Sequence, residues 1–317
     1  MNPLERVRVG ATDLRVTRLG LGGAALGGAY GPTTDSEADS TIEKALRLGI
    51  RYVDTAPLYG RGLSEGRLGR YFASRGKPSD LVLSTKVGRI LRPGSGNQEP
   101  LYDYTREGVL RSVESSLGRL GVDAVDILYI HDPDDHYEEA ISQAYRALAE
   151  LRQTGRVKAI GAGMNQWEME LRFAQEGDFD CFLQAGKYTL LDQSADEKFL
   201  PYCLEKGIGV VAGAPFSYGI LAADFRHGAG PSSRFVDPAL VEKARKIDVV
   251  CARHDVPLRA AALQFILAHP AITSVIPGAR TQEEIQENFE LIGYDIPGRL
   301  WDDLKREKLI PERSVVP

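Results

Sequence analysis

Short apolar runs alternate with longer segments of helical character along the whole chain. The runs consist mainly of β-branched and aliphatic residues, as buried parallel strands do. They cover residues 19–22, 52–54, 82–86, 125–130, 157–161, 181–184, 209–212 and 273–277. The segments between them carry helix-capping signals or apolar residues at helical spacing. They cover residues 34–48, 62–74, 105–120, 137–154, 166–176, 196–206, a pair within 238–269, and 281–292.

This alternation predicts the fold class. Eight strands, each followed by a helical segment, are typical of an α/β protein with a closed (β/α)8 TIM barrel. The main alternative is an open doubly wound sheet, which would carry Gly-x-Gly-x-x-Gly between its first strand and helix. Gly20-Leu21-Gly22-Gly23 has the glycines, but an irregular loop follows instead of a helix. We therefore expect the barrel.

Three segments lie outside the repeating pattern. Residues 6–18 alternate apolar and basic side chains on both sides of a turn, which predicts a β-hairpin. We expect this hairpin to plug the N-terminal mouth of the barrel. Residues 88–104 and 216–237 are long, rich in glycine and proline, and follow predicted strands. Long loops at the C-terminal face of a barrel are commonly functional.

Composition narrows the class of protein. The chain has 317 residues, 43% of them hydrophobic, and a formal net charge of −5. Barrels of this size fold as one unit, so we expect a single domain over residues 1–317. The mild acidity argues against nucleic acid as a partner. We find no apolar run long enough for a membrane span and no signal-peptide pattern.

The three cysteines predict a cytoplasmic protein with reduced thiols. Cys181, Cys203 and Cys251 are odd in number and form no CxxC motif. The histidines outside the candidate site, His136, His227, His254 and His269, show no metal-ligand spacing. We therefore expect no metal. The sequence favours no particular oligomeric state.

The candidate chemistry lies at the ends of three consecutive predicted strands. Asp54 and Lys86 end two of them, His131 follows the third, and Tyr59 comes just after Asp54. The carboxyl ends of barrel strands open on one face, where barrel enzymes carry their active sites. Each residue alone could be structural, as a turn former, an ion-pair partner or a packing aromatic. Their joint occurrence predicts one acid–base site.

At these residues the chain resembles the aldo-keto reductases over essentially its full length. The motifs that carry the resemblance are Asp54-Thr55-Ala56 with Tyr59, Gly62-Leu63-Ser64-Glu65 with Leu68-Gly69, Ser84-Thr85-Lys86, His131, Gly161-Ala162-Gly163-Met164-Asn165, Gln184, and Ile276-Pro277-Gly278 with Glu287-Asn288. Within the family, Pro57-Leu58-Tyr59-Gly60 and Lys86-Val87-Gly88-Arg89 are most similar to the aldose 1-dehydrogenase branch. That branch includes galactose, fucose and threo-aldose dehydrogenases and a pyridoxal dehydrogenase.

The resemblance implies an NAD(P)-dependent oxidoreductase with Asp54, Tyr59, Lys86 and His131 as catalytic residues. A free tyrosine has a pKa of about 10, and a neighbouring ammonium lowers that pKa by stabilising the phenolate. Lys86 would do so for Tyr59, with Asp54 holding the charge of Lys86. Tyr59 would then be the general acid for reduction and the general base for oxidation. His131 would orient the substrate oxygen.

The resemblance also implies a nucleotide site. Asn165 would bind the nicotinamide carboxamide and Gln184 would lie under the ring. Many relatives carry an aromatic residue, stacked on the ring, where this chain has Gly213, so the stacking partner stays open, with Phe216 as a partial substitute. The full set of expected nucleotide contacts is Gly23, Asp54, Asn165, Gln184, Gly213, Pro215, Phe216, Gly278, Arg280, Glu284, Glu287 and Asn288.

The sequence signals for NADP and NAD conflict. Arg280 can pair with a 2′-phosphate and tilts the expectation toward NADP, whereas Glu284 would repel that phosphate and accept a ribose hydroxyl of NAD. Glu284 can also be explained as part of a capping box with Thr281. Some relatives carry a lysine where this chain has Gly278. The choice between NADP and NAD therefore stays open.

Arg89 and Asp132, with Tyr102 and Tyr104, predict a polar and aromatic rim around the substrate. Such a rim suits a small hydroxylated substrate. Tyr59 and His131 would also contact this substrate. The favoured reaction is oxidation of an aldose at C1. The alternatives are an NADPH-dependent reductase of aldehydes or sugar aldehydes, a pyridoxal-type dehydrogenase, and a nucleotide-sensing binding subunit like the potassium-channel β-subunits that resemble this family.

Overall fold

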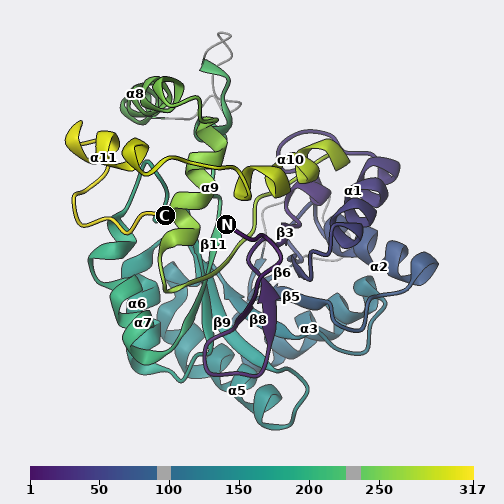
Figure 1. Ribbon diagram of the computed structural model, residues 1–317. Coiled ribbons are helices and arrows are strands. Elements are labelled where there is room, and N and C mark those ends of the chain that lie inside the picture. Colours follow the sequence, from purple (N-terminus) through teal and green to yellow (C-terminus); the bar gives the residue numbers. More distant parts are fainter. Residues whose placement is uncertain (91–100, 226–236) are drawn as a thin grey trace.

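Eight parallel strands form the centre of the molecule in the computed structural model, which describes residues 1–90, 101–225 and 237–317 (Figure 1). The sheet has the order β12-β11-β10-β9-β8-β5-β4-β3. Its strands are β3 (Leu21–Gly22), β4 (Tyr52–Asp54), β5 (Val82–Val87), β8 (Ile127–His131), β9 (Ala159–Met164), β10 (Cys181–Ala185), β11 (Gly209–Gly213) and β12 (Ile272–Val275). Each predicted run overlaps one of these strands.

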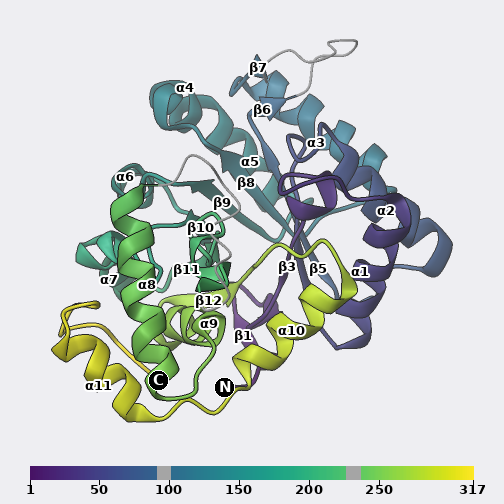
Figure 2. The ribbon, with the colours of Figure 1, turned by 90° about the horizontal axis from the view of Figure 1, so that it is seen from above.

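The two edges of the sheet meet, so that the strands enclose a barrel. Parallel bridges pair Leu19 with Val275 and Gly22 with Gly278, and the Gly20 amide donates to the Val275 carbonyl at 2.9 Å. Helices surround the strands on the outside (Figure 2). The predicted (β/α)8 barrel is therefore confirmed.

The helices follow the predicted segments closely. They are α1 (Asp35–Arg47), α2 (Leu63–Arg75), α3 (Arg106–Leu120), α4 (Tyr137–Glu139), α5 (Tyr145–Gln153), α6 (Trp167–Glu176), α7 (Phe199–Lys206), α8 (Pro238–Arg253), α9 (Leu258–Ala268), α10 (Gln282–Ile292) and α11 (Gly298–Arg306). The predicted capping box is present at α1, where Thr34 and Glu37 exchange hydrogen bonds. A π-helical segment, η3 (Ala140–Ala144), interrupts the helix predicted over 137–154. Our sequence analysis did not predict α11, which packs against α8.

Shorter elements complete the fold. Single-turn helices are η1 (Ala25–Gly27), η2 (Asp134–His136), η4 (Ser194–Glu197) and η5 (Ile220–Ala222). In the predicted loop 88–104, β6 (Arg89–Ile90) pairs antiparallel with β7 (Leu101–Tyr102). Residues 91–100 of that loop, and residues 226–236 with His227, Gly228, Gly230 and Pro231, lie outside the described residues.

The predicted N-terminal hairpin is present as β1 (Arg6–Arg8) and β2 (Arg15–Thr17), paired antiparallel. Its apolar residues Val9, Leu14 and Val16 are buried in one cluster with residues of the barrel strands, including Cys181. Gly10, at the turn, has φ +54°, and a Cβ there would lie 2.1 Å from the Asp180 carbonyl oxygen. Since Asp180 directly precedes β10, the hairpin covers the N-terminal end of the barrel.

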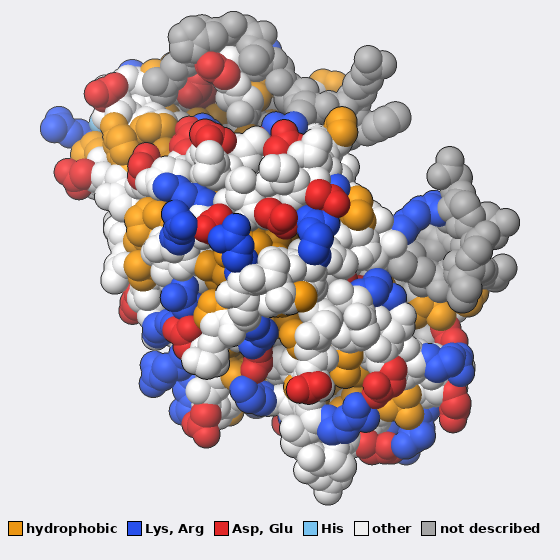
Figure 3. All heavy atoms as spheres, turned by 90° about the vertical axis from the view of Figure 1, so that its right-hand side faces the viewer, with side chains coloured by type: hydrophobic (Ala, Val, Ile, Leu, Met, Phe, Trp, Pro, Cys, Tyr) orange, Lys and Arg blue, Asp and Glu red, His pale blue; other side chains and the backbone are white. Residues whose placement is uncertain are grey.

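Figure 3 shows the face of the molecule that carries α1 and α2, where basic and acidic side chains are interspersed rather than separated by sign. Ion pairs also link the two helices, for example Arg67 with Asp35 and Arg70 with Asp39, both at 2.8 Å. Nucleic-acid binding favours a clustered basic surface. The charges of this face therefore provide no such footprint.

Candidate active site

Four polar side chains meet at the carboxyl ends of β4, β5 and β8. Asp54 is the last residue of β4, Lys86 lies near the end of β5, and His131 is the last residue of β8. Because β5 pairs with both β4 and β8, these strand ends are adjacent. Tyr59, from the loop between β4 and α2, lies beside them. The structure thus brings the four predicted catalytic residues together.

Lys86 and Asp54 form a fully buried ion pair, each with a side chain only 1% exposed. The Lys86 ammonium donates to Asp54 Oδ2 at 2.5 Å and to the Thr55 carbonyl at 2.9 Å. The Ser84 hydroxyl donates to the other carboxylate oxygen, Oδ1, at 2.7 Å. Burial alone would lower the pKa of Lys86, but its attraction to Asp54 and Tyr59 raises that pKa overall. Lys86 is therefore held as a cation.

Tyr59 lies next to this cation, with the Lys86 ammonium 4.7 Å from the centre of the Tyr59 ring. Burial raises the pKa of Tyr59 to about 12, although Lys86 acts in the opposite direction. The lowered pKa that we expected from the sequence took account of the ammonium and not of the desolvation. Without a bound ligand, Tyr59 is protonated at neutral pH.

His131 is the fourth member of the site, with its ring edge-to-face against Tyr59 at 6.0 Å. Burial, together with the positive charges of Lys86 and Arg89, holds the pKa of His131 well below its usual range. The ring is therefore neutral. Its Nδ1 is buried without a hydrogen-bond partner among the described residues, and its Nε2 lies 3.8 Å from Asp132 Oδ2.

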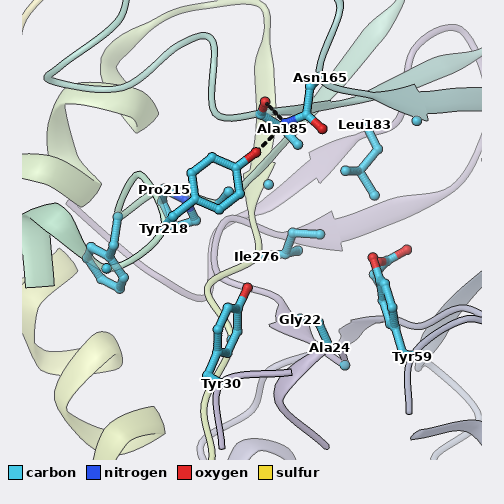
Figure 4. Close-up of a pocket in the computed structure, with 18 of the residues that line it drawn as sticks. Gly22, Ala24, Tyr30, Tyr59, Asn165, Leu183, Ala185, Pro215, Tyr218 and Ile276 are labelled. Carbon is cyan, nitrogen blue, oxygen red and sulfur yellow. Dashed lines mark hydrogen bonds between the residues drawn. The ribbon is translucent and has the colours of Figure 1, made fainter. Parts of the chain in front are cut away.

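These residues line one end of a cavity of about 610 Å³ (Figure 4). The cavity runs from Lys86 to the start of α10. The predicted site residues that line it are Gly23, Asp54, Tyr59, Lys86, Arg89, His131, Asp132, Asn165, Gly213, Pro215, Phe216, Gly278, Arg280, Glu284 and Asn288.

Two predicted residues, Gln184 and Glu287, are not part of the cavity wall. Along β10 the alternate residues Leu183 and Ala185 face the cavity, so Gln184 between them faces away. The Gln184 amide instead donates to the Asn165 carbonyl at 3.0 Å and accepts from the Lys187 amide at 2.9 Å. Glu287 forms an ion pair with Arg259, which does line the cavity.

Asn165 directly follows β9, and its side-chain amide forms a hydrogen bond with a loop residue. Its Nδ2 donates to the Ala185 carbonyl at 2.9 Å and to the Tyr218 hydroxyl at 2.5 Å (Figure 4). Both amide protons are used, so Asn165 offers a ligand its carbonyl oxygen. Tyr218 and its neighbour Ser217 have positive φ angles of 57° and 48°. The loop therefore holds a strained backbone where it places Tyr218 at the cavity.

The space beside Gly213 is small. A Cβ at this position would lie 3.0 Å from Leu183 Cδ2, so Leu183 stands where a larger side chain at 213 would pack. Two exposed tyrosines, Tyr30 and Tyr218, line the cavity instead, from the side away from Tyr59 (Figure 4). Neither tyrosine was predicted from the sequence, because both lie in irregular segments where aromatic residues give no periodic signal.

The far end of the cavity is formed by the turn before α10. Arg280 and Glu284 form an ion pair at 2.9 Å, and Glu284 also accepts from the Arg280 backbone amide at 2.7 Å. Thr281 caps the helix by accepting from the Glu284 amide at 3.3 Å. The Glu284 carboxylate thus bonds Arg280 rather than the Thr281 amide, and only one half of the expected capping box forms.

The end near His131 carries a second ion pair, between Arg89 and Asp132. Asp132 has a φ of +44°, and the Tyr104 hydroxyl donates to the carbonyls of His131 and Asp132 at 2.7 and 2.8 Å. Tyr104 is fully buried and, like Tyr102, does not line the cavity, contrary to its expected place on the rim. Its role is to fix the backbone that carries His131 and Asp132.

No cluster of three or more His, Cys, Asp or Glu side chains suitable for a metal ion occurs in residues 1–90, 101–225 and 237–317. No helix in the same ranges has the length and apolar character needed to cross a membrane. All three cysteines are buried and are thiols rather than disulfides.

Comparison with known proteins agrees with this geometry. Residues 18–301 match the model of the aldo/keto reductase family. The chain is 38% identical to a pyridoxal 4-dehydrogenase of Microbacterium luteolum, over 96% of this chain and 98% of that protein. It is 38% identical to a D-threo-aldose 1-dehydrogenase of a Pseudomonas species, over 95% and 97% of the two chains.

A third relative, an L-galactose dehydrogenase of Arabidopsis thaliana, is 31% identical over 92% of this chain and 89% of its own length. Among solved structures, aldo-keto reductase AKR11C1 of Bacillus halodurans in its holo form superposes with a TM-score of 0.80 at 25% identity. That match covers 98% of this chain and 99% of the other. The chain therefore belongs to the aldo/keto reductase family and is an NAD(P)-dependent oxidoreductase.

Proposed function

We propose that this protein is an aldose-type dehydrogenase that oxidises a small polyhydroxylated substrate at its hemiacetal carbon, C1, to the lactone. The observation that carries the proposal is the contact of Tyr59 with the buried Lys86–Asp54 pair at one end of the cavity. Oxidation of a hydroxyl group needs a base at the oxygen and an acceptor for the hydride. The protein supplies the first and its nucleotide the second.

The cavity suits a nicotinamide dinucleotide. Glycines line it where the backbone comes close, and a Cβ at Gly22 or Gly23 would lie 2.7 or 2.6 Å from a carbonyl oxygen. Arg259 and Arg280 provide positive charge, and the N-terminus of α10 is a favourable place for a phosphate. When bound, the nicotinamide ring accepts or donates the hydride. Asn165 would hold the ring's carboxamide through its free carbonyl oxygen.

The acid–base roles follow from the electrostatics of the four residues. As a phenolate, Tyr59 takes the proton of the C1 hydroxyl, and Lys86 stabilises the negative charge of that phenolate. Asp54 keeps Lys86 charged and in place. His131 is neutral, so it can direct a ring N–H at the substrate oxygen without adding a charge to the site.

Arg89 and Asp132 recognise the substrate in this proposal. Their ion pair lines the cavity beside His131, where a guanidinium and a carboxylate can bind neighbouring hydroxyl groups. The similarity to D-threo-aldose 1-dehydrogenase and L-galactose dehydrogenase supports a sugar as the hydroxylated substrate. A pyridoxal-type aldehyde is the alternative that pyridoxal 4-dehydrogenase suggests.

Arg280 alone predicts a preference for NADP. Its pairing with Glu284 instead favours NAD. A 2′-phosphate would have to compete with Glu284 for the guanidinium and would lie beside a carboxylate. A 2′-hydroxyl can instead donate to Glu284 while the ion pair stays intact. We therefore propose NAD as the better nucleotide, with NADP as the alternative.

One observation favours the reverse reaction as a second candidate. The pKa of about 12 keeps Tyr59 protonated in the unliganded site, and a protonated tyrosine is the acid that aldehyde reduction requires. A panel of aldoses and aldehydes, run in both directions with both nucleotides, separates the two. Brisk reduction of aldehydes without oxidation of any aldose would contradict the C1 dehydrogenase. Tightly bound nucleotide without turnover in either direction would instead indicate a nucleotide-sensing subunit.

A further inference from the structure

A chain of polar side chains runs through the interior of the barrel below Asp54. Ser84 on β5 contacts Asp54 Oδ1 at 2.7 Å, and the Tyr52 hydroxyl lies 3.2 Å from Ser84 Oγ. The Tyr129 hydroxyl lies 3.3 Å from that of Tyr52, and the Cys181 thiol lies 3.5 Å from Tyr129. Ser84, Tyr52, Tyr129 and Cys181 are all 0% exposed. Barrel interiors are usually packed with branched aliphatic residues, so this row of hydrogen-bonded polar side chains needs an explanation.

The direction of every hydrogen bond in the chain follows from the charge of Asp54. An ionised carboxylate can only accept, so the single proton of Ser84 is directed at Asp54. Ser84 must then accept from Tyr52. The same counting makes Tyr129 the donor to Tyr52 and Cys181 the donor to Tyr129. The donors therefore point one way, from Cys181 to Asp54, and each bond polarises the next.

This row of polar side chains ends at Cys181, in a part of the interior that is shielded from solvent. Cys181 is buried in one cluster with Val9, Leu14 and Val16 of the N-terminal hairpin. The hairpin thus separates the last member of the chain from water. A buried route without an opening to solvent does not deliver protons, but it can hold a charge in place.

We propose that Ser84, Tyr52 and Tyr129 are positioning residues that keep the Asp54 carboxylate ionised and turned toward Lys86. This inference rests on the proposed function, since it assigns an effect on turnover to groups that do not line the cavity. Burial raises the pKa of Asp54, and the charge and hydrogen bond of Lys86, followed by the Ser84 hydrogen bond, act in the opposite direction. Tyr52 and Tyr129 polarise the Ser84 hydrogen bond in turn, so the row of donors helps to keep Asp54 ionised without a second cation.

Weakening the chain should change the titration of Tyr59. Lys86, Tyr59 and Tyr52 are the titratable groups facing Asp54, and Lys86, Asp54, His131 and Tyr30 are those facing Tyr59. If Asp54 loses a donor, its pKa rises and the carboxylate fixes Lys86 less firmly beside Tyr59. A Lys86 ammonium that moves away from Tyr59 stabilises the phenolate less, so the pKa of Tyr59 rises as well.

The test compares Ser84→Ala and Tyr52→Phe with two matched controls. Ser274→Ala removes an equally buried strand hydroxyl that bonds the Thr17 carbonyl, and Tyr188→Phe removes a buried tyrosine hydroxyl without a partner among the described residues. The readouts are the pH profile of kcat for oxidation, KM and nucleotide affinity. We expect Ser84→Ala to lower kcat about 10- to 100-fold near neutral pH, as loss of a hydrogen bond to a charged group does.

We also expect the pH profile of Ser84→Ala to move to higher pH, with nucleotide affinity unchanged. Tyr52→Phe should move the profile in the same direction by less, and Ser84→Thr should restore it. Tyr52→Phe keeps the buried ring, so it carries the test if Ser84→Ala does not fold. Profiles of both variants that coincide with those of the controls, while Tyr59→Phe loses most of its kcat, would overturn this inference and leave the proposed function intact. A Tyr59→Phe variant that keeps most of its kcat would overturn the proposed function itself.

Discussion

At the residue scale, the site depends on charges kept out of water. Lys86 and Asp54 are each 1% exposed, and neither has a second ion-pair partner among the described residues. Removing one partner of such a pair leaves the other as an uncompensated buried charge. The same burial keeps His131 neutral and Tyr59 protonated. The four residues therefore act as a unit in which each protonation state depends on the others.

Tyr59→Phe should reduce kcat by about 100- to 10,000-fold, the range expected for loss of a general acid–base group. The ring and its contact with Lys86 remain, so nucleotide affinity should change little. Steady-state kinetics and a nucleotide titration monitored by fluorescence check the two parts separately. A variant that keeps most of its kcat would show that another group transfers the proton.

Lys86→Met should abolish turnover and also destabilise the fold by about 3–5 kcal/mol, because it would leave the buried Asp54 carboxylate without the Lys86 cation. Urea denaturation measures the loss. The double variant Lys86→Met with Asp54→Leu removes both charges and serves as the control, which should recover stability but not activity. Equal stability of Lys86→Met and the native protein would contradict the buried ion pair.

The pH dependence of oxidation should be alkaline. Tyr59 acts as a base only after losing its proton, and burial raises its pKa to about 12 in the unliganded site. The deprotonated fraction therefore grows as the pH rises, and the positive charge of the oxidised nicotinamide increases it further. We expect kcat for oxidation to rise above neutral pH and kcat for reduction to fall. A profile of kcat for oxidation that declines between neutral and mildly alkaline pH would contradict this assignment.

At the scale of elements, strand ends carry the proposed catalytic residues, and loops carry further side chains that line the cavity. The pairing of β5 with β4 and β8 brings Asp54, Lys86 and His131 together, so the catalytic geometry is part of the sheet. The start of α10 carries Arg280 and Glu284, and the loop after β11 carries Tyr218. Changes in these two segments should alter nucleotide binding without disturbing the acid–base residues.

Glu284→Gln should improve binding of NADP relative to NAD by about 1–3 kcal/mol. The substitution removes a negative charge beside the 2′-position and releases Arg280 for a charge-assisted bond to the phosphate. Arg280→Ala should have the opposite effect and weaken NADP more than NAD. Dissociation constants of both nucleotides for both variants provide the measurement. Equal changes for the two nucleotides would place Arg280 and Glu284 away from the 2′-position.

Gly10→Ala tests the hairpin plug. A Cβ at Gly10 would lie 2.1 Å from the Asp180 carbonyl oxygen, and φ is +54°. We expect a loss of about 1–3 kcal/mol in the free energy of unfolding, as for other strained backbone positions. Gly118→Ala in α3 is the control, since a Cβ there meets nothing within 4 Å and alanine favours helix. It should stabilise the protein slightly.

At the scale of the whole molecule, periodicity predicted the barrel because each strand and helix buries a continuous apolar face. The ends of β4, β5 and β8 could be located from the sequence for the same reason, and with them Asp54, Lys86 and His131. Gln184 was expected at the nucleotide from the resemblance and not from periodicity. Strand side chains alternate between two faces, and along β10 the structure places Leu183 and Ala185, rather than Gln184, at the cavity.

Other contacts give no periodic signal at all. Tyr218 reaches the cavity through a loop with positive φ angles, and Tyr30 approaches from another irregular segment. In the sequence, Tyr52 and Tyr129 have the same strand pattern as their aliphatic neighbours in the barrel interior. Only the three-dimensional structure shows that their hydroxyl groups connect to Asp54 through Ser84.

The central claim is hydride removal from C1 with Tyr59 as the base. The most direct test incubates the enzyme with the preferred aldose, carrying deuterium at C1, and oxidised NAD, and then measures the label in the reduced nucleotide by mass spectrometry. We predict transfer of deuterium to the nucleotide by the native enzyme, with lactone as the product, and loss of this transfer in Tyr59→Phe. Reduced nucleotide without deuterium, or equal transfer by Tyr59→Phe, would contradict the account.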